Sequence, residues 1–140
     1  MQAIRNPVLA CLFLMLLLCG CGGKYDTCPV SGKVTLNDGT PVDGVQVTFE
    51  CRQPALTAVA VTDQDGNYRL GTVEAGDGAP AGNYRVTVVE LPDEKDPDNP
   101  PPPRIHGKYR SFTRSGLEFT VKKGRNTFEI QLDPPAAQSP

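Results

Sequence analysis

The sequence predicts an all-β protein that folds as a seven-stranded antiparallel β-sandwich. Glycine and proline contribute 14 residues each to a chain of 140. From residue 29 onward, apolar and polar residues alternate with a period of two, and no segment shows the longer period of an amphipathic helix. Short alternating segments separated by turn formers are typical of antiparallel strands packed in two sheets.

The first half of this pattern contains four predicted strands. Residues 30–36 (VSGKVTL) and 45–51 (VQVTFEC) alternate on either side of the turn cluster NDGTPVDG, and they predict an antiparallel hairpin with one buried face. A third strand is expected at residues 57–62 (TAVAVT). After the turn DQDGN, a short strand is expected at residues 68–73 (YRLGTV).

The second half contains three predicted strands. Residues 83–91 (NYRVTVVEL) are rich in β-formers, and their later part is apolar on both faces, which predicts a central strand. Residues 117–121 and 126–132 alternate again on the two sides of the turn KKGR. The side chains expected to face inward in these two strands are Leu117, Phe119, Val121, Phe128, Ile130 and Leu132.

The pattern also divides the chain into segments. A signal peptide (1–20) and a tether (21–28) precede the sandwich (29–133), and a disordered tail (134–140) follows it. Residues 92–104 (PDEKDPDNPPPPR) contain six prolines in thirteen residues and cannot pair as a strand. They are expected to form a mobile surface loop with polyproline II character, either a recognition segment or an insertion that the fold tolerates.

The N-terminal segment predicts export and lipid attachment. The apolar run Val8–Leu18 has the length of a signal-peptide core and is too short to span a bilayer. Residues 18–21 (LCGC) resemble the bacterial lipobox, which implies diacylglyceryl transfer to Cys21 and cleavage before it. The alternative is an ordinary secretory signal. The lipobox implies an extracytoplasmic, membrane-anchored lipoprotein of the cell envelope, in either the outer or the inner membrane.

Besides the lipidated Cys21, two cysteines remain after such processing, Cys28 and Cys51, and both fall on the inward parity of their predicted strands. If Leu36 faces Asp43 across the predicted hairpin, the two cysteines lie directly opposite each other. If Leu36 faces Val45, they lie diagonally and a bond requires a bend. An oxidising compartment outside the cytoplasm favours a disulfide. The alternative is two unlinked cysteines, one in the core and one at a strand end.

Composition argues against several functions. The net charge of −2 gives no reason to expect a nucleic-acid partner. His106 is the only histidine and lies in a predicted loop, so no Ser-His-Asp set is expected. No catalytic residue, cofactor or metal ligand is therefore expected.

Two local patterns suggest chemistry but have simpler explanations. Asp63, Asp65 and Asn67 are spaced like the first ligands of a calcium-binding loop, but the glycine stands at position four instead of six. An Asp-Gly turn accounts for the same residues. Lys33 and Asn126 are the obvious pair for an intramolecular isopeptide bond, but the alternation places Lys33 on the outward face.

Four short motifs follow one another along the predicted strands: VxGxV, PVxGxxVxF, TDxxGxY and GxYxVxV. They resemble those of prealbumin-like (transthyretin-like) modules, also called carboxypeptidase regulatory-like domains, and the end of the chain resembles small bacterial lipoproteins built from one such module. The resemblance covers residues 29–133 and implies a seven-stranded prealbumin-like sandwich outside the cytoplasm, but no activity. The matching residues are Val30, Gly32, Val34, Pro41, Val42, Gly44, Val47, Phe49, Thr62, Asp63, Gly66, Tyr68, Gly82, Tyr84, Val86 and Val88.

One enzyme class shares this fold, the 5-hydroxyisourate hydrolases, whose chains end in Tyr-Arg-Gly-Ser. Here Tyr109-Arg110-Ser111 lacks the glycine and lies well before the C-terminus. Those enzymes also use more than one histidine, so hydrolase activity is not expected.

The expected function is therefore a structural or interaction role at the cell envelope, without catalysis. The expected partners are the membrane, through the lipid anchor, and an envelope protein or glycan. The alternative is a glycan- or peptide-binding module that uses residues 92–104 and the loops at the strand ends.

Overall fold

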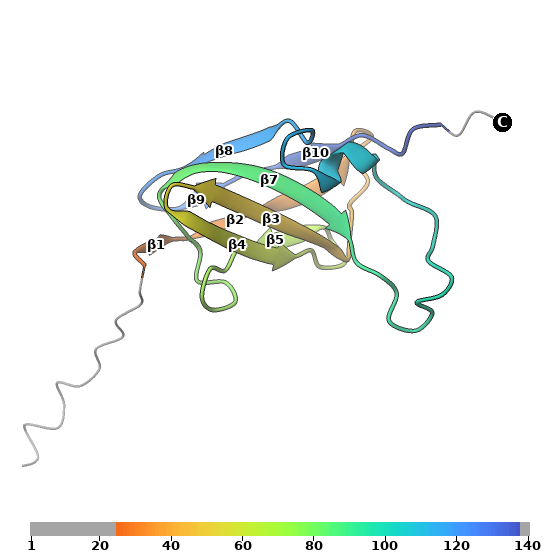
Figure 1. Cartoon of the computed structure of the whole chain (residues 1–140), viewed down its shortest axis with the longest axis horizontal. Coiled ribbons are helices and arrows are strands. Elements are labelled where there is room, and N and C mark those ends of the chain that lie inside the picture. Colours follow the sequence, from red (N-terminus) through yellow and green to blue (C-terminus); the bar gives the residue numbers. More distant parts are fainter. Residues whose placement is uncertain (1–24, 138–140) are drawn as a thin grey trace, which may run out of the picture.

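The computed structural model of the protein describes residues 25–137. This part of the chain is all-β, with one short 3-10 helix and no α-helix (Figure 1). The strands are β1 (Thr27–Cys28), β2 (Val30–Leu36), β3 (Val45–Arg52), β4 (Ala55–Val61), β5 (Asn67–Arg69), β6 (Ala79–Pro80), β7 (Gly82–Glu90), β8 (Leu117–Val121), β9 (Asn126–Thr127) and β10 (Ile130–Leu132), and the helix is η1 (Gly107–Arg110).

Two four-stranded sheets form the layers of the sandwich. One has the order β4-β3-β7-β8, and the other has the order β10-β2-β5 with β9 also paired to β2. Strands β1 and β6 form a separate two-stranded ladder. The described residues thus contain ten strands in three sheets instead of the expected seven strands. Each predicted segment does contain a strand, but the last is divided into β9 and β10, and β1 and β6 are additional.

The prediction of a purely antiparallel sandwich is wrong around β2. This strand runs parallel to β9 and β10, with Val34 opposite Ile130. The turn at residues 122–125 does not close a hairpin, because β8 lies beside β7 in one sheet and β9 lies beside β2 in the other. A tight hairpin enforces antiparallel pairing, whereas a chain that crosses between layers can join a strand in either direction.

The predicted hairpin between the first two strands is also wrong, because β2 and β3 lie in different sheets. After β2 the chain folds back only as far as Pro41, which forms a single bridge with Thr35. Pro41 has no N–H to donate to a longer ladder, and Gly44 turns the chain with a φ of 65°. Strand β3 therefore packs in the layer facing β2, and both strands keep their apolar faces in the core.

The core is organised around Phe49 of β3, which is completely buried. The ring centroids of Tyr68, Tyr84, Phe119 and Phe128 lie 5.7 to 6.4 Å from that of Phe49. These rings come from both sheets, so one aromatic cluster holds the two layers together.

The two ends of the sandwich carry different segments (Figure 1). The chain enters the fold through β1 at one end, which we call the N-terminal end. The opposite end, which we call the loop end, carries the proline-rich loop and η1. The N-terminal end comprises residues 25–29, 52–54, 70–81 and 122–125, and the loop end comprises residues 37–44, 62–66 and 91–116.

The domain boundaries differ slightly from the predicted ones. Strand β1 pairs with β6, so Thr27 and Cys28 belong to the fold and not to the tether predicted at residues 21–28. Residues 134–137 are exposed and contain no strand. The predicted signal peptide, the first part of the tether and the last three residues of the tail lie outside the described residues.

Candidate functional site

Two residues of the predicted motifs, Gly32 and Tyr68, form one structural unit. They are cross-strand partners on β2 and β5, and the Tyr68 hydroxyl donates a hydrogen bond to the carbonyl of Phe128 at 2.8 Å. A Cβ atom at position 32 would lie 1.8 Å from that carbonyl oxygen. Burial raises the pKa of Tyr68 well above its ordinary value. The hydroxyl therefore remains a neutral donor that holds the chain between β9 and β10.

The motif TDxxGxY forms the turn between β4 and β5. One carboxylate oxygen of Asp63 accepts hydrogen bonds from the backbone N–H groups of Asp65 and Asn67, both at 2.9 Å. Gly66 adopts a φ of 79°, and its carbonyl accepts a hydrogen bond from the N–H of Val34 at 2.8 Å. These residues thus shape an Asp-Gly turn and dock it on β2, which accounts for the spacing that resembles a calcium-binding loop.

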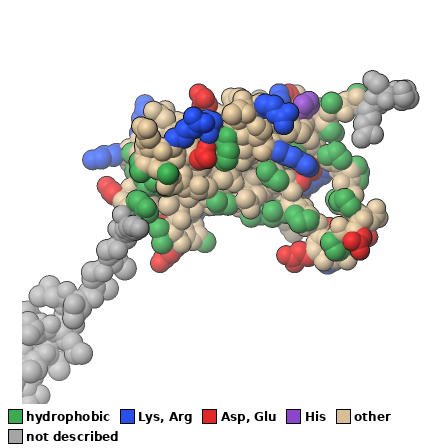
Figure 2. Space-filling view, in the orientation of Figure 1, with side chains coloured by type: hydrophobic (Ala, Val, Ile, Leu, Met, Phe, Trp, Pro, Cys, Tyr) green, Lys and Arg blue, Asp and Glu red, His purple; other side chains and the backbone are tan. Residues whose placement is uncertain are grey.

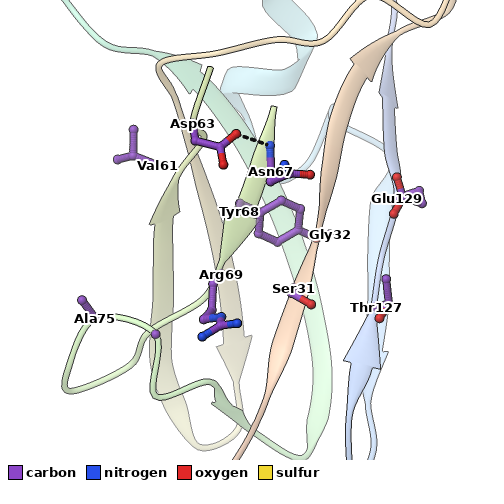
Figure 3. Close-up of a pocket in the computed structure, with 11 residues that line it drawn as sticks. Ser31, Gly32, Val61, Asp63, Asn67, Tyr68, Arg69, Ala75, Thr127 and Glu129 are labelled. Carbon is purple, nitrogen blue, oxygen red and sulfur yellow. Dashed lines mark hydrogen bonds between the residues drawn. The ribbon is translucent and has the colours of Figure 1, made fainter. Parts of the chain in front are cut away.

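A groove of about 720 Å³ lies over the outward face of β9, β2 and β5 (Figure 3). Ser31 lies in its middle, with Arg69 on β5 and Thr127 on β9 as its cross-strand partners. Asn67 and Glu129 also line the groove. The side chains of these five residues make no hydrogen bond or ion pair with any other described residue.

The groove offers hydrogen-bonding groups but no aromatic platform. Tyr68 is the aromatic residue that lines it, and only 3% of this residue is exposed. Exposed Val61 supplies apolar surface at one edge. The groove can therefore bind a polar ligand through hydroxyl, amide, guanidinium and carboxylate groups, without stacking.

The proline-rich loop projects from the loop end of the sandwich (Figure 1). Every residue from Leu91 to Arg104 is exposed. The loop borders a hollow of about 530 Å³, which is lined by four prolines together with Glu90, Leu91, Arg104 and Arg110. Proline-rich backbone favours the extended polyproline II conformation and loses little entropy on binding. This segment is therefore suited to contact a partner.

Arg104 clamps the loop to the sandwich. Its guanidinium donates to the side chain and the carbonyl of Asp43 at 2.8 and 2.7 Å, and to Glu90 at 3.2 Å. Its backbone N–H donates to Glu90 at 2.9 Å. Hydrogen bonding from Arg104 lowers the pKa of Asp43. No local sequence pattern predicts this clamp, because its partners stand 14 and 61 positions away along the chain.

A second polar cluster joins η1 to the end of β10. The Asp133 carboxylate accepts hydrogen bonds from Lys108, Tyr109 and Asn37, and the Tyr109 hydroxyl accepts one from the Asp133 N–H. Hydrogen bonds lower the pKa of Asp133 to about 2; the one from Lys108 has the largest effect, followed by those from Asn37 and Tyr109. Tyr109, part of the sequence that was compared with the hydrolase motif, is buried and has a structural role here.

We predict that replacing Lys108 with methionine raises the pKa of Asp133 from about 2 toward its ordinary value of 3.8. Because the folded-state pKa is below the unfolded value, this group stabilises the fold above pH 3.8, and that contribution disappears as the pH falls through about 2. The carboxyl carbon shift of Asp133 in an NMR titration measures the change. Lys95→Met, in the loop, serves as the control and is expected to leave this titration unchanged.

The two cysteines of the predicted pair are buried, but the hairpin that was expected to bring them together is absent. Cys28 and Cys51 are both buried, as their parity predicted, and both are free thiols in the structure. Cys51 donates a weak hydrogen bond to the carbonyl of Gln53 at 3.5 Å. Burial raises the pKa of Tyr84 to about 12, and the Cys51 and Cys28 thiols contribute to that increase. The expected hairpin no longer supports a disulfide between Cys28 and Cys51, but both thiols lie near Tyr84.

The disulfide between Cys28 and Cys51 remains a prediction, now as a link between the β1-β6 ladder and strand β3 near Tyr84. Closing this loop stabilises the fold by about 3 kcal/mol on the chain-entropy model. Protein purified under oxidising conditions, unfolded without reductant and treated with a thiol reagent, is expected to label at neither cysteine. The same sample after reduction is expected to label at both. Labelling at both sites before reduction would rule the bond out.

The residues considered for an isopeptide bond are not brought together. Lys33 is on the outward face of β2, whereas Asn126 is 8% exposed and lies opposite Val30. The Asn126 side chain donates to the carbonyls of Lys122 and Gly124 and accepts from the Lys122 N–H. Its amide is thus committed to the turn between β8 and β9.

Other predicted features fall outside what the structure can place. Cys21, the predicted lipidation site, lies outside the described residues. Within residues 25–137, no cluster of three or more His, Cys, Asp and Glu side chains is arranged to hold a metal ion. Over the same range, no helix has both the length and the apolar character needed to cross a membrane.

Comparison with known proteins gives limited information. No family model matches the sequence, and no curated protein matches it significantly. Among solved structures, a DUF3823 family protein from Parabacteroides merdae is similar, with 16% sequence identity and a TM-score of 0.46. The match covers 79% of this chain and 47% of that one, so this chain spans less than half the length of its structural relative.

Proposed function

We propose that this protein is a lipid-anchored, extracytoplasmic interaction module with a prealbumin-like sandwich. The lipobox-like residues 18–21 support the anchor, and the four motifs support the prealbumin-like assignment. No catalytic step is proposed. Gly32, Asp63, Gly66 and Tyr68 of the motifs are used for packing and turn formation, as expected for a scaffold.

The observation that carries this proposal is the proline-rich loop clamped by Arg104 at the loop end. Strand β1, through which the chain enters the fold, lies at the opposite end of the sandwich (Figure 1). A domain anchored through Cys21 would thus hold the loop on the side away from its attachment point. Exposed Leu91 and the run Pro100–Pro103 would there meet an envelope protein that recognises polyproline II backbone.

Cross-linking in intact cells, followed by purification of the full-length protein, tests this role. We expect Pro101→Ser combined with Pro102→Ser to reduce the recovery of envelope proteins that the unchanged protein captures. Pro134→Ser combined with Pro135→Ser is the matched control, because it removes two exposed prolines from the tail. If both double variants capture the same proteins as the unchanged chain, the loop is not the contact.

A second candidate function is glycan binding. The groove over β9, β2 and β5 supports it, because the hydroxyls of Ser31 and Thr127 and the amide of Asn67 are free to pair with sugar hydroxyls. An NMR titration of the protein with envelope glycan fragments tests it. Shifts at these three residues support glycan binding, whereas a spectrum unchanged by every fragment contradicts it.

A further inference from the structure

We infer that the N-terminal end of the sandwich carries a basic face that binds the phosphate groups of anionic phospholipids beside the lipid anchor. This inference rests on the proposed function, because the anchor at Cys21 brings this face to the membrane. It adds a second contact, which would hold the domain in one orientation.

The first part of the basic face is the turn between β8 and β9. Lys122, Lys123 and Arg125 are exposed there, and their side chains make no ion pair with a described residue. The buried side chain of Asn126 accepts from the Lys122 N–H at 2.9 Å and donates to the carbonyls of Lys122 and Gly124 at 2.8 and 3.1 Å. The backbone of the turn is therefore preorganised, and only the cationic side chains must be ordered on binding.

The second part is a hollow of about 220 Å³ between Arg69 and Arg125. Ser31 lines the hollow, and neither guanidinium makes a side-chain hydrogen bond or an ion pair within residues 25–137. Two guanidinium groups and a hydroxyl around one hollow provide several N–H and O–H donors. This arrangement suits the oxygens of a phosphate group, which arginine binds with paired hydrogen bonds.

The charge distribution gives the two ends different signs. Residues 93–98 at the loop end carry four acidic side chains and one lysine, and Figure 2 shows acidic side chains on the loop that projects from the body. At the N-terminal end and on the adjoining β5, the basic side chains are Arg52, Arg69, Lys122, Lys123 and Arg125, and the acidic ones are Asp26, Glu74 and Asp77. The Asp77 carboxylate accepts hydrogen bonds from three backbone N–H groups in its own turn.

The distance to the membrane is short. Three residues lie between Cys21 and Tyr25, the first described residue, and the four Cα–Cα steps of a fully extended chain span about 14 Å. Electrostatic attraction reaches about 8 Å at physiological ionic strength. The tether thus keeps the N-terminal end close enough for its basic side chains to meet the headgroups, while the acidic loop is repelled from an anionic surface.

Lysine footprinting of the lipidated protein tests the inference with the protein's own residues. The purified protein is incorporated into vesicles of phosphatidylcholine alone or of phosphatidylcholine mixed with phosphatidylglycerol, and a lysine-reactive reagent is added. We expect modification of Lys122 and Lys123 to be about fivefold slower on the anionic vesicles, since one basic residue near such a surface gains about 1 kcal/mol. Lys95 in the loop is the internal reference and should react equally on both.

Arginine variants and changes in ionic strength provide two further tests of the lysine protection. Arg69→Gln combined with Arg125→Gln is expected to abolish most of the protection, whereas Arg114→Gln at the loop end is expected to leave it intact. Raising the ionic strength should weaken the protection because the charges are exposed.

Three other results would overturn the inference in different ways. Equal modification rates on both vesicle types would contradict lipid binding by the basic face but would leave the proposed anchor intact. Protection on neutral vesicles by added inorganic phosphate alone would indicate a site for a free anion instead of a membrane contact. A protein that associates with neither vesicle type lacks the anchor, so the proposed function fails together with this inference.

Discussion

Replacing Gly32 with alanine is expected to destabilise the fold by about 3 kcal/mol or more, because the new methyl group has no room. Its Cβ would lie 1.8 Å from the carbonyl oxygen of Phe128 and 2.9 Å from the Tyr68 ring. The carbonyl cannot move without breaking its hydrogen bond to the Tyr68 hydroxyl. The backbone there also continues into β10, which pairs with β2, so a displacement would spread along the sheet.

Chemical denaturation followed by fluorescence of the tyrosines or by circular dichroism measures this effect. Gly107→Ala is the matched control, because a Cβ at that position has no atom within 4 Å. It is expected to change the free energy of unfolding by less than about 0.5 kcal/mol. A Gly32→Ala protein that unfolds within about 1 kcal/mol of the unchanged protein would contradict the close packing described here.

Replacing Cys21 with serine is expected to abolish lipid attachment completely. A serine hydroxyl cannot form the thioether through which the lipobox cysteine receives its diacylglyceryl group. Membrane binding through such a group depends on its acyl chains, and each buried CH₂ contributes about 0.8 kcal/mol. The loss should therefore be an all-or-none change and not a graded one.

Growth with an alkyne-tagged fatty acid, followed by purification and detection of the tag, measures this attachment. The unchanged protein should carry the tag, and Cys21→Ser should carry none. Cys28→Ser is the matched control, because Cys28 lies in β1 inside the fold, and it should be tagged normally. A tagged Cys21→Ser protein, or an untagged unchanged protein, would show that the anchor is placed wrongly.

These two substitutions test separate parts of the molecule. Gly32 belongs to the scaffold, and its motif is explained by packing alone. Cys21 belongs to the proposed attachment of that scaffold to the envelope, which is inferred from the sequence before the fold begins. The proposed contacts, the clamped loop and the basic face, lie at opposite ends of the sandwich.

The sequence by itself determined where most of the strands lie and which of their side chains face inward. Val30, Val34, Val47 and Phe49 are buried as their alternation predicted, and all seven predicted segments contain strands. Alternation is a local property, because successive side chains in an extended chain point to opposite faces whatever the strand pairs with. The turn at Asp63 could also be predicted from the sequence, since its hydrogen bonds join residues within four positions of each other.

Only the tertiary structure decided which strands are neighbours and which charges meet. The parallel pairing of β2 with β10 joins residues 96 positions apart, as Val34 and Ile130 do. Arg104 reaches Asp43 across 61 positions, and Arg69 and Arg125 line one hollow. Alternation specifies a buried face but not a partner strand, so pairing depends on how the whole set of apolar faces closes one core.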